Sequence, residues 1–180
     1  MKVVNIGNER ELRPGFEDMP VVSLWNVPVL RRFRFYRYGY FSFWNRALVG
    51  PGLKDAPSEI LRSGLAHEYG HIAESHGFYM AGGASLIVVA SYLSGMLFPA
   101  FRAALVSSGV AAAMLVFLGV GRYLEYRADD MAVKICGRNE ALRASLWFAE
   151  KCGTIKQTER RKRLLRLGWD GKATWRDIRV

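Results

Sequence analysis

The chain contains little cysteine and little histidine. Its two cysteines cannot build a disulfide framework, and their spacing from the three histidines matches no Cys/His zinc ribbon. Residues 1–14 lack an apolar run, so they do not predict a secretory signal. Residues 77–101 lack any charged side chain. What is present, 51% apolar residues among 180, excludes a disordered chain and favours one domain over 1–180.

Basic residues outnumber acidic ones, which gives a formal net charge of +10. The densest basic strings, 31–37 and 160–163, lie in a basic N-terminal segment over 1–37 and a basic C-terminal segment over 154–180. Such strings are compatible with nucleic acid or with anionic lipid. Because every Lys and Arg except Arg102 lies before residue 77 or after residue 121, we favour anionic headgroups and expect no nucleic-acid partner.

Two charge-free stretches predict a transmembrane helical hairpin. At ~1.5 Å per residue, helices over 77–98 and 103–121 would be about 33 and 28 Å long, and a hydrocarbon core is roughly 30 Å thick. Pro99 and Arg102 mark the turn between them. The alternative is a hairpin buried in a soluble protein or oligomer, which would need more covering chain than remains. The Lys/Arg bias predicts an integral membrane protein with both termini on the cytoplasmic side.

An H-E-x-x-H sequence, His67-Glu68-Tyr69-Gly70-His71, stands immediately before the first span. On a helix, which we predict over 55–76, His67 and His71 project from one face and can present two imidazole nitrogens to one zinc ion. Glu68 would lie beside them and accept a proton from water. The alternative is that the two histidines merely pack against neighbouring helices.

A catalytic zinc site needs a third protein ligand. His76 follows His71 by five residues, whereas an extended motif with a third histidine requires six. Glu125 and Asp129, one helical turn apart just after the second span, offer a carboxylate ligand and a carboxylate that supports a ligand. Two antiparallel arms of similar length return the chain to one membrane face, so we expect the site at the cytoplasmic edge of the bilayer.

Four stretches together resemble the gluzincin-type membrane zinc metallopeptidases, the family that includes the HtpX protease and the CAAX prenyl endopeptidase. They are 47–53 with 58–61, 65–72, the hydrophobic hairpin, and 125–133. The resemblance covers about residues 45–150. It implies a single peptidase domain, mainly α with a small β-sheet (α+β, a gluzincin-like minimal catalytic domain), that carries the two-helix hairpin. The helix with the third ligand and the helix after it would occupy 122–151.

The resemblance also implies the roles of individual residues. Glu68 would be the general base, and Asp129 would support His67. One Zn²⁺ ion would be bound by His67, His71 and Glu125. A strand within 38–53, for which Tyr38–Val49 is our candidate, would run along the cleft and pair with extended polypeptide substrate; the alternative is a plain sheet edge.

The chain departs from the family at two places. Residues 1–76 predict none of the further spans of the prenyl endopeptidases, so a short HtpX-like form fits better. The usual Thr-His-Pro stretch is reduced to Thr154-Ile155-Lys156, although Arg161 falls where an arginine is expected. The candidates for stabilising the transition state are Arg161, Tyr123 and Tyr126.

The C-terminal residues carry a weaker signal. Residues 160–166 read as a short basic amphipathic helix on the membrane surface, and Trp169 and Trp175 as either interfacial anchors or core. The function we expect is a membrane-embedded, zinc-dependent metalloendopeptidase that cuts membrane or membrane-proximal proteins. The alternative is a catalytically silent membrane adaptor that retains the fold. The sequence leaves the oligomeric state open.

Overall fold

A computed structural model describes residues 19, 21–23, 37–43 and 46–180. Most of the predicted N-terminal segment 1–37, including the basic string up to residue 36, lies outside the described residues. The helices are α2 (Ser58–Ala73), α3 (His76–Leu97), α4 (Arg102–Cys136), α5 (Arg138–Cys152) and α6 (Thr158–Leu167). The strands are β1 (Val21–Ser23), β2 (Tyr40–Phe43) and β3 (Arg46–Val49), and short 3₁₀ turns cover Pro51–Leu53 and Pro99–Phe101. The predicted fold, mainly α with a small sheet, is confirmed.

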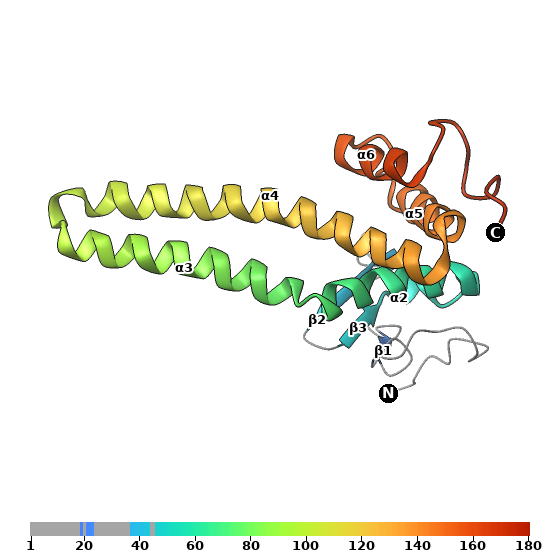
Figure 1. Ribbon diagram of the computed structural model, residues 1–180, viewed down its shortest axis with the longest axis horizontal. Helices are drawn as coiled ribbons and strands as arrows, with labels where there is room; N and C mark the ends of the chain where they lie inside the picture. The colour runs from blue at the N-terminus through green and yellow to red at the C-terminus, as the bar shows by residue number, and fades with distance from the viewer. Residues whose placement is uncertain (1–18, 20, 24–36, 44–45) are drawn as a thin grey trace.

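The molecule has two parts that differ in shape. In Figure 1, α3 and α4 run side by side as a long antiparallel hairpin, away from a compact part that holds α2, α5, α6 and the sheet. The core of the compact part is built from α2, α5, α6 and β3, and its most deeply buried large side chains are Leu53, Ile60, Leu65, Leu146, Leu164 and Val49. The compact part therefore has a hydrophobic core of its own, to which the hairpin is attached through α2 and α4.

The predicted strand Tyr38–Val49 is wrong as a single strand. The chain turns back on itself, so that β2 pairs antiparallel with β3, with Tyr40 opposite Val49. The described sheet has the order β1-β3-β2, with β1 parallel to β3. Ala47 and Val49 of β3 are fully buried, so the central strand fills the core while β2 forms an edge. The edge strand next to α2 is therefore shorter than predicted, because it consists of β2 and does not include β3.

Helix α2 carries the H-E-x-x-H sequence and begins after Pro57, whose ring is tolerated at a helix start but not inside one. Two glycines let neighbours approach it closely. A Cβ at Gly64 would lie 2.3 Å from the ring of Tyr40, and one at Gly70 would lie 2.9 Å from the Cα of Ala128 on α4. Both contacts require the absence of a side chain. They bring β2 and α4 against the face of α2 that bears the histidines.

Helix α4 is longer than the predicted second span. It runs without a break over 35 residues to Cys136, where Gly137 with φ 86° ends it. The expectation that a separate helix begins at residue 122 is therefore wrong, because no proline or turn signal interrupts the helix after the apolar stretch. As a consequence, Glu125 and Asp129 belong to the same continuous helix as the second arm of the hairpin.

The hairpin presents large apolar side chains outward. Leu86, Leu97 and Leu115 are each more than 70% exposed, and both helices are long and apolar enough to cross a membrane. The arms touch closely where Gly109 faces Ser91, since a Cβ at Gly109 would lie 1.9 Å from the Ser91 hydroxyl. At the tip, Arg102 donates a hydrogen bond to the hydroxyl of Tyr92. Small residues between the arms and leucines outside are typical of a pair of membrane helices.

The C-terminal segment packs against the compact part. The helix expected over 160–166 is present as α6, but its Leu164 and Leu167 are buried in the protein core instead of facing a membrane. Trp169 is 8% exposed and donates its indole N–H to the carbonyl of Ala173, and Trp175 packs against the same core. Of the two alternatives for the tryptophans, the core location holds.

Candidate metal centre

His67, His71 and Glu125 meet where α2 packs against α4. The Nε2 atoms of the two histidines are 3.3 Å apart. The Glu125 carboxylate lies 3.6 Å from Nε2 of His67 and 3.5 Å from Nε2 of His71. One ligand atom from each of the three residues falls within 4.8 Å of the other two. The structure thus brings together the three predicted ligands, although they are separated by up to 58 positions in the chain.

This donor set fits a zinc ion by chemistry and by spacing. Imidazole nitrogen and carboxylate oxygen are both zinc ligands, and three protein ligands leave a fourth position open. Ligand atoms about 2.0–2.1 Å from a tetrahedral zinc ion stand roughly 3.3–3.4 Å from each other. The two Nε2 atoms, 3.3 Å apart, match that value, and with one oxygen of Glu125 the three donor atoms lie within 4.8 Å of one another. The three side chains therefore converge on one point where a zinc ion could be bound.

His67 is supported by a buried carboxylate. Its Nδ1 lies 3.0 Å from Oδ1 of Asp129, whose side chain is 4% exposed. A hydrogen bond at Nδ1 leaves Nε2 free to face the metal position, which is how a supporting carboxylate orients a ligand histidine. The structure brings Asp129 to the partner that was expected for it.

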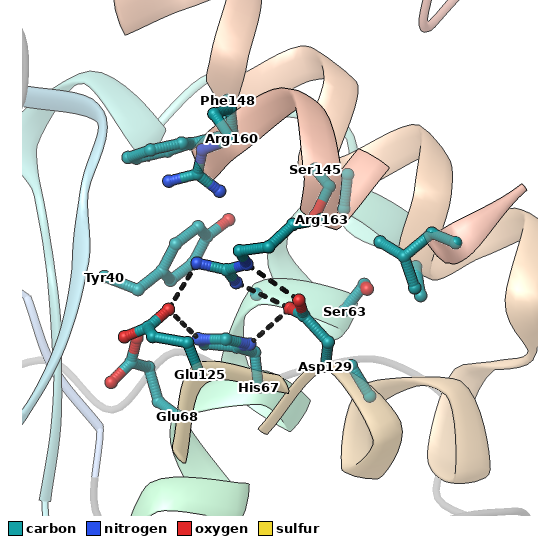
Figure 2. A pocket seen from close by; sticks show the side chains of 15 residues that line it. Tyr40, Ser63, His67, Glu68, Glu125, Asp129, Ser145, Phe148, Arg160 and Arg163 are labelled. Atoms are coloured by element: carbon teal, nitrogen blue, oxygen red, sulfur yellow. Dashed lines mark hydrogen bonds and ion pairs between the residues drawn. The ribbon is translucent and has the colours of Figure 1, made fainter. Parts of the chain in front are cut away.

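Arg163 on α6 completes this side of the centre (Figure 2). Its guanidinium donates two hydrogen bonds to Asp129, of 2.8 and 2.6 Å, and a third to the Glu125 carboxylate. Only 13% of the Arg163 side chain is exposed. A single arginine therefore fixes both the third ligand and the carboxylate that orients His67, and it does so from a helix close to the C-terminus.

The charges around His67 act on its protonation. Burial disfavours the imidazolium, but the hydrogen bond with Asp129 and the nearby Glu125 carboxylate outweigh burial and raise the pKa of His67 to about 9. The two carboxylates thus create a strong preference for a positive charge at this point. A divalent cation satisfies the same preference, and metal binding would displace the proton.

His71 is supported by a different set of residues. Its Nδ1 lies 2.8 Å from Nδ1 of His76, whose Nε2 lies 3.1 Å from the Glu74 carboxylate. Arg127 on α4 then holds Glu74 through two hydrogen bonds of 3.0 and 2.8 Å. If His71 presents a lone pair at Nε2, its Nδ1–H donates to His76, and the Nε2–H of His76 donates to Glu74. The four residues form a chain of donors with a consistent direction.

The local backbone explains why His76 reaches back. Helix α2 ends at Ala73, and Ser75 adopts a left-handed conformation with φ 54° before α3 begins at His76. This sharp change of direction places the His76 ring 4.9 Å from the ring of His71, and His76 is 3% exposed. Its separation of five residues from His71, which rules it out as a third ligand in an extended motif, thus suits it to a supporting position.

Glu68 is buried beside the three donors, with 6% of its surface exposed. Burial raises the pKa of Glu68, and the neighbouring histidines oppose the effect. A side-chain hydrogen bond with Ser42 ties it to β2. A carboxylate whose pKa lies above the ordinary value, next to the place where water would be activated, has the properties of a general base.

A cleft opens beside the donors, with about 690 Å³ of empty space including the solvent at its mouth. His67, Glu68, Glu125 and Asp129 line it together with residues of β2, α2, α5 and α6. Tyr40 forms part of the wall and donates its hydroxyl hydrogen to the carbonyl of Ile60.

The residues expected to stabilise a transition state lie elsewhere. None of Arg161, Tyr123 and Tyr126 lines the cleft. Arg161 is exposed, Tyr123 is 59% exposed, and the ring of Tyr126 is covered by Arg166. The arginines that face the cleft are Arg160 and Arg163.

A sequence signal for these two arginines did exist. Leu164 and Leu167 mark the buried face of α6, and residues 160 and 163, which precede them by one helical turn, share that face. Arg161 points away because it lies about 100° further round the helix. The resemblance favoured Arg161 because of its position in the sequence. The packing of Leu164 and Leu167 instead turns Arg160 and Arg163 toward the cleft.

Comparison with known proteins gives one match. A sequence model described as peptidase family M48 matches residues 53–159, which is more than half of the chain. No curated protein and no solved structure matches the chain. The matched segment includes the H-E-x-x-H sequence, the hairpin, Glu125 and Asp129, and it ends one residue before Arg160.

Proposed function

The chain belongs to peptidase family M48, and from this premise we propose that it is a zinc-dependent endopeptidase that cuts membrane or membrane-proximal proteins. The observation that carries the proposal is that His67, His71 and Glu125 each offer one zinc-ligating atom, and that these three atoms lie within 4.8 Å of one another. The family supports a metallopeptidase activity. The identity of the metal, the endopeptidase action and the substrates belong to the proposal.

Each residue then has a defined task in hydrolysis. When bound, a zinc ion supplies Lewis-acid chemistry, polarising the scissile carbonyl and lowering the pKa of the attacking water. Glu68 accepts the proton of that water and passes it to the leaving amine. The raised pKa of Glu68 suits both steps, because the group must accept and release a proton near neutral pH.

The edge strand offers a way to hold the substrate. Within the described sheet, β2 has a neighbour only on its β3 side, and its Tyr40 lines the cleft. An extended polypeptide that pairs with the free side of β2 would be led across the three donors. This arrangement favours unfolded or extended substrates over compact ones.

The hairpin supports a location in a membrane. Its apolar outer surface and the concentration of Lys and Arg outside it favour membrane insertion, with the metal centre on the cytoplasmic side. Among the described residues, the hairpin contains the only two helices that could cross a membrane.

The decisive test compares the parental protein with Glu68→Gln, each purified in detergent and loaded with zinc, on an unfolded substrate such as casein. Loss of a general base is expected to lower the cleavage rate by roughly 10²–10⁴-fold while one zinc remains bound. Chelation should abolish parental activity, and zinc should restore it.

Glu59→Gln is the matched control, because Glu59 lies on the same helix but pairs with Arg143 and does not line the cleft. It should cleave at the parental rate. Parental protein that binds zinc but cuts nothing would favour the silent adaptor instead. A Glu68→Gln variant as active as the parent would refute the assignment of the base.

A further inference from the structure

Two guanidinium groups face the cleft, and they differ in their partners. Arg163 is fully engaged by Asp129 and Glu125. Arg160, one turn earlier on α6, forms no ion pair with any carboxylate of the described residues. Figure 2 shows its guanidinium directed toward the same space as that of Arg163. Arg163 is thus paired directly with two carboxylates, whereas Arg160 is attracted to Asp129 and Glu125 only from beyond ion-pair distance.

The surroundings of Arg160 hold the group in place without a direct ion pair among the described residues. The guanidinium carbon lies 4.9 Å from the centre of the Phe148 ring, a cation–π contact that fixes the position of the side chain. Burial, together with the positive charge of Arg163, lowers the pKa of Arg160 to about 10, so the group stays charged at neutral pH. A partly buried guanidinium that has no ion-pair partner among the described residues is a favourable place for an anion.

The cleft leaves space in front of this cation. Four of the residues that line the cleft have small side chains, namely Ala132, Ala141, Ala144 and Ser145. Arg160 lines the same cleft as His67 and Glu125, and Figure 2 shows the guanidinium of Arg163 between Arg160 and these two ligands. A group that binds Arg160 would therefore be part of whatever molecule lies across the metal centre.

We propose that Arg160 is a specificity residue that binds a carboxylate of the substrate close to the scissile bond. The inference rests on the proposed function, since it presupposes that a polypeptide occupies the cleft. A planar carboxylate can accept two parallel hydrogen bonds from the guanidinium, a geometry that an amide or a cation cannot reproduce. The enzyme would accordingly prefer substrates with Asp or Glu near the cleaved bond, or a chain end that places its terminal carboxylate there.

The test uses zinc-loaded, full-length protein and fluorogenic peptides built around one cleavage site mapped in casein. Each of the three positions on either side of the scissile bond is set in turn to Glu, Gln or Lys. At one position, Glu should exceed Gln by roughly tenfold or more in kcat/KM, which is the size of effect expected for a charge-assisted hydrogen bond. A parallel series with free or amidated C-termini separates a side-chain carboxylate from a terminal one.

Variants then assign the preference to Arg160. Arg160→Gln should lower the Glu/Gln ratio to within twofold of unity, whereas Arg160→Lys should retain part of it. Arg160→Glu should favour the Lys peptide. Lys162→Gln is the matched control: it removes one positive charge from the same helix, but Lys162 is exposed and does not line the cleft, so the parental ratio should persist.

Each outcome separates this inference from the proposed function. If the parent cuts the Glu, Gln and Lys peptides equally and ignores amidation, the inference is wrong and the peptidase stands. A preference that survives in Arg160→Gln overturns it as well. If zinc-loaded parent cuts no peptide and no casein, the proposed function fails, and the inference fails with it. The comparison on the parental enzyme remains decisive even if the variants do not fold.

Discussion

His67 and His71 lie one turn apart on α2, yet the chain supports the two rings in opposite ways. His67 is held by Asp129, whose carboxylate is buried and is itself held by Arg163. His71 is held by His76, which leads to Glu74 and then to Arg127 at the surface, where the arginine side chain is 46% exposed. One support is anchored in the core of the compact part, and the other ends in solvent beside the start of the hairpin.

This difference has an energetic consequence. A buried charge must keep its partner, because an unpaired charge in the interior is strongly unfavourable, whereas an exposed pair is screened by water and salt. We therefore expect substitutions in the buried support of His67 to have large effects on stability or zinc affinity. Substitutions in the support of His71 should have smaller effects, and the effect should decrease from His76 toward the exposed Arg127. Four substitutions test this ranking.

The largest effect is expected for Arg163→Met. This change leaves Asp129 buried with His67 as its remaining partner and removes the link from α6 to α4, so the metal-free protein should lose about 3–5 kcal/mol of stability. Thermal unfolding in detergent measures the loss. Lys162→Met, at an exposed site of the same helix, should leave the unfolding temperature nearly unchanged. Equal unfolding temperatures for the two variants would mean that Arg163 is not an anchor.

Asp129→Asn should have the next largest effect, on metal binding. The variant retains the shape of the side chain but loses the charge that orients His67, and changes of this kind typically weaken metal affinity roughly 10–100-fold. Competition with a zinc chelator measures the dissociation constant. Asp130→Asn is the control, because Asp130 pairs with Arg166 on the exposed side of the same helix. An unchanged zinc affinity in Asp129→Asn would show that the buried support is not needed.

His76→Phe should weaken zinc binding about tenfold, the lower end of the same range. The phenyl ring fills the space of the imidazole but offers no acceptor to Nδ1 of His71, so His71 loses its preferred tautomer. His76→Asn restores an acceptor near the same place and should recover part of the affinity in the same chelator titration. If Phe and Asn at this position behave alike, His76 acts only by packing.

The smallest effect is expected for Arg127→Gln. The Arg127–Glu74 pair is exposed, so zinc affinity should fall at most about threefold at low salt, and the difference from the parent should vanish at high salt. Zinc titrations at two ionic strengths measure both quantities. A loss as large as that of Asp129→Asn would overturn the comparison between the two supports.

The sequence predicts the metal ligands better than their supports. His67, His71 and the pair Glu125 and Asp129 follow from helical spacing, and the hairpin that joins them follows from two charge-free stretches, because both are local properties of the chain. His76 was considered only as a ligand. Its role depends on the left-handed turn at Ser75, which no residue preference there predicts.

Packing decides the remaining differences. Arg163 and Arg160 face the cleft because Leu164 and Leu167 dock α6 in one rotational setting, and this docking requires the core of α5 and α2 to be known. In the same way, the segment predicted as one strand over 38–49 forms two strands, β2 and β3. The apolar residues of β2 lie at the edge of the sheet, whereas those of β3 lie in its central strand. Tertiary contacts settle helix rotation and strand pairing, which sequence periodicity leaves open.

The central claim is that Glu125 closes a three-residue zinc site with His67 and His71. The most direct measurement is the zinc content and zinc affinity of Glu125→Gln next to those of the parent and of Asp130→Asn, purified identically in detergent. The account predicts one tightly held zinc per chain in the parent and in Asp130→Asn, and little or none in Glu125→Gln. A Glu125→Gln protein that holds one zinc with parental affinity would contradict it.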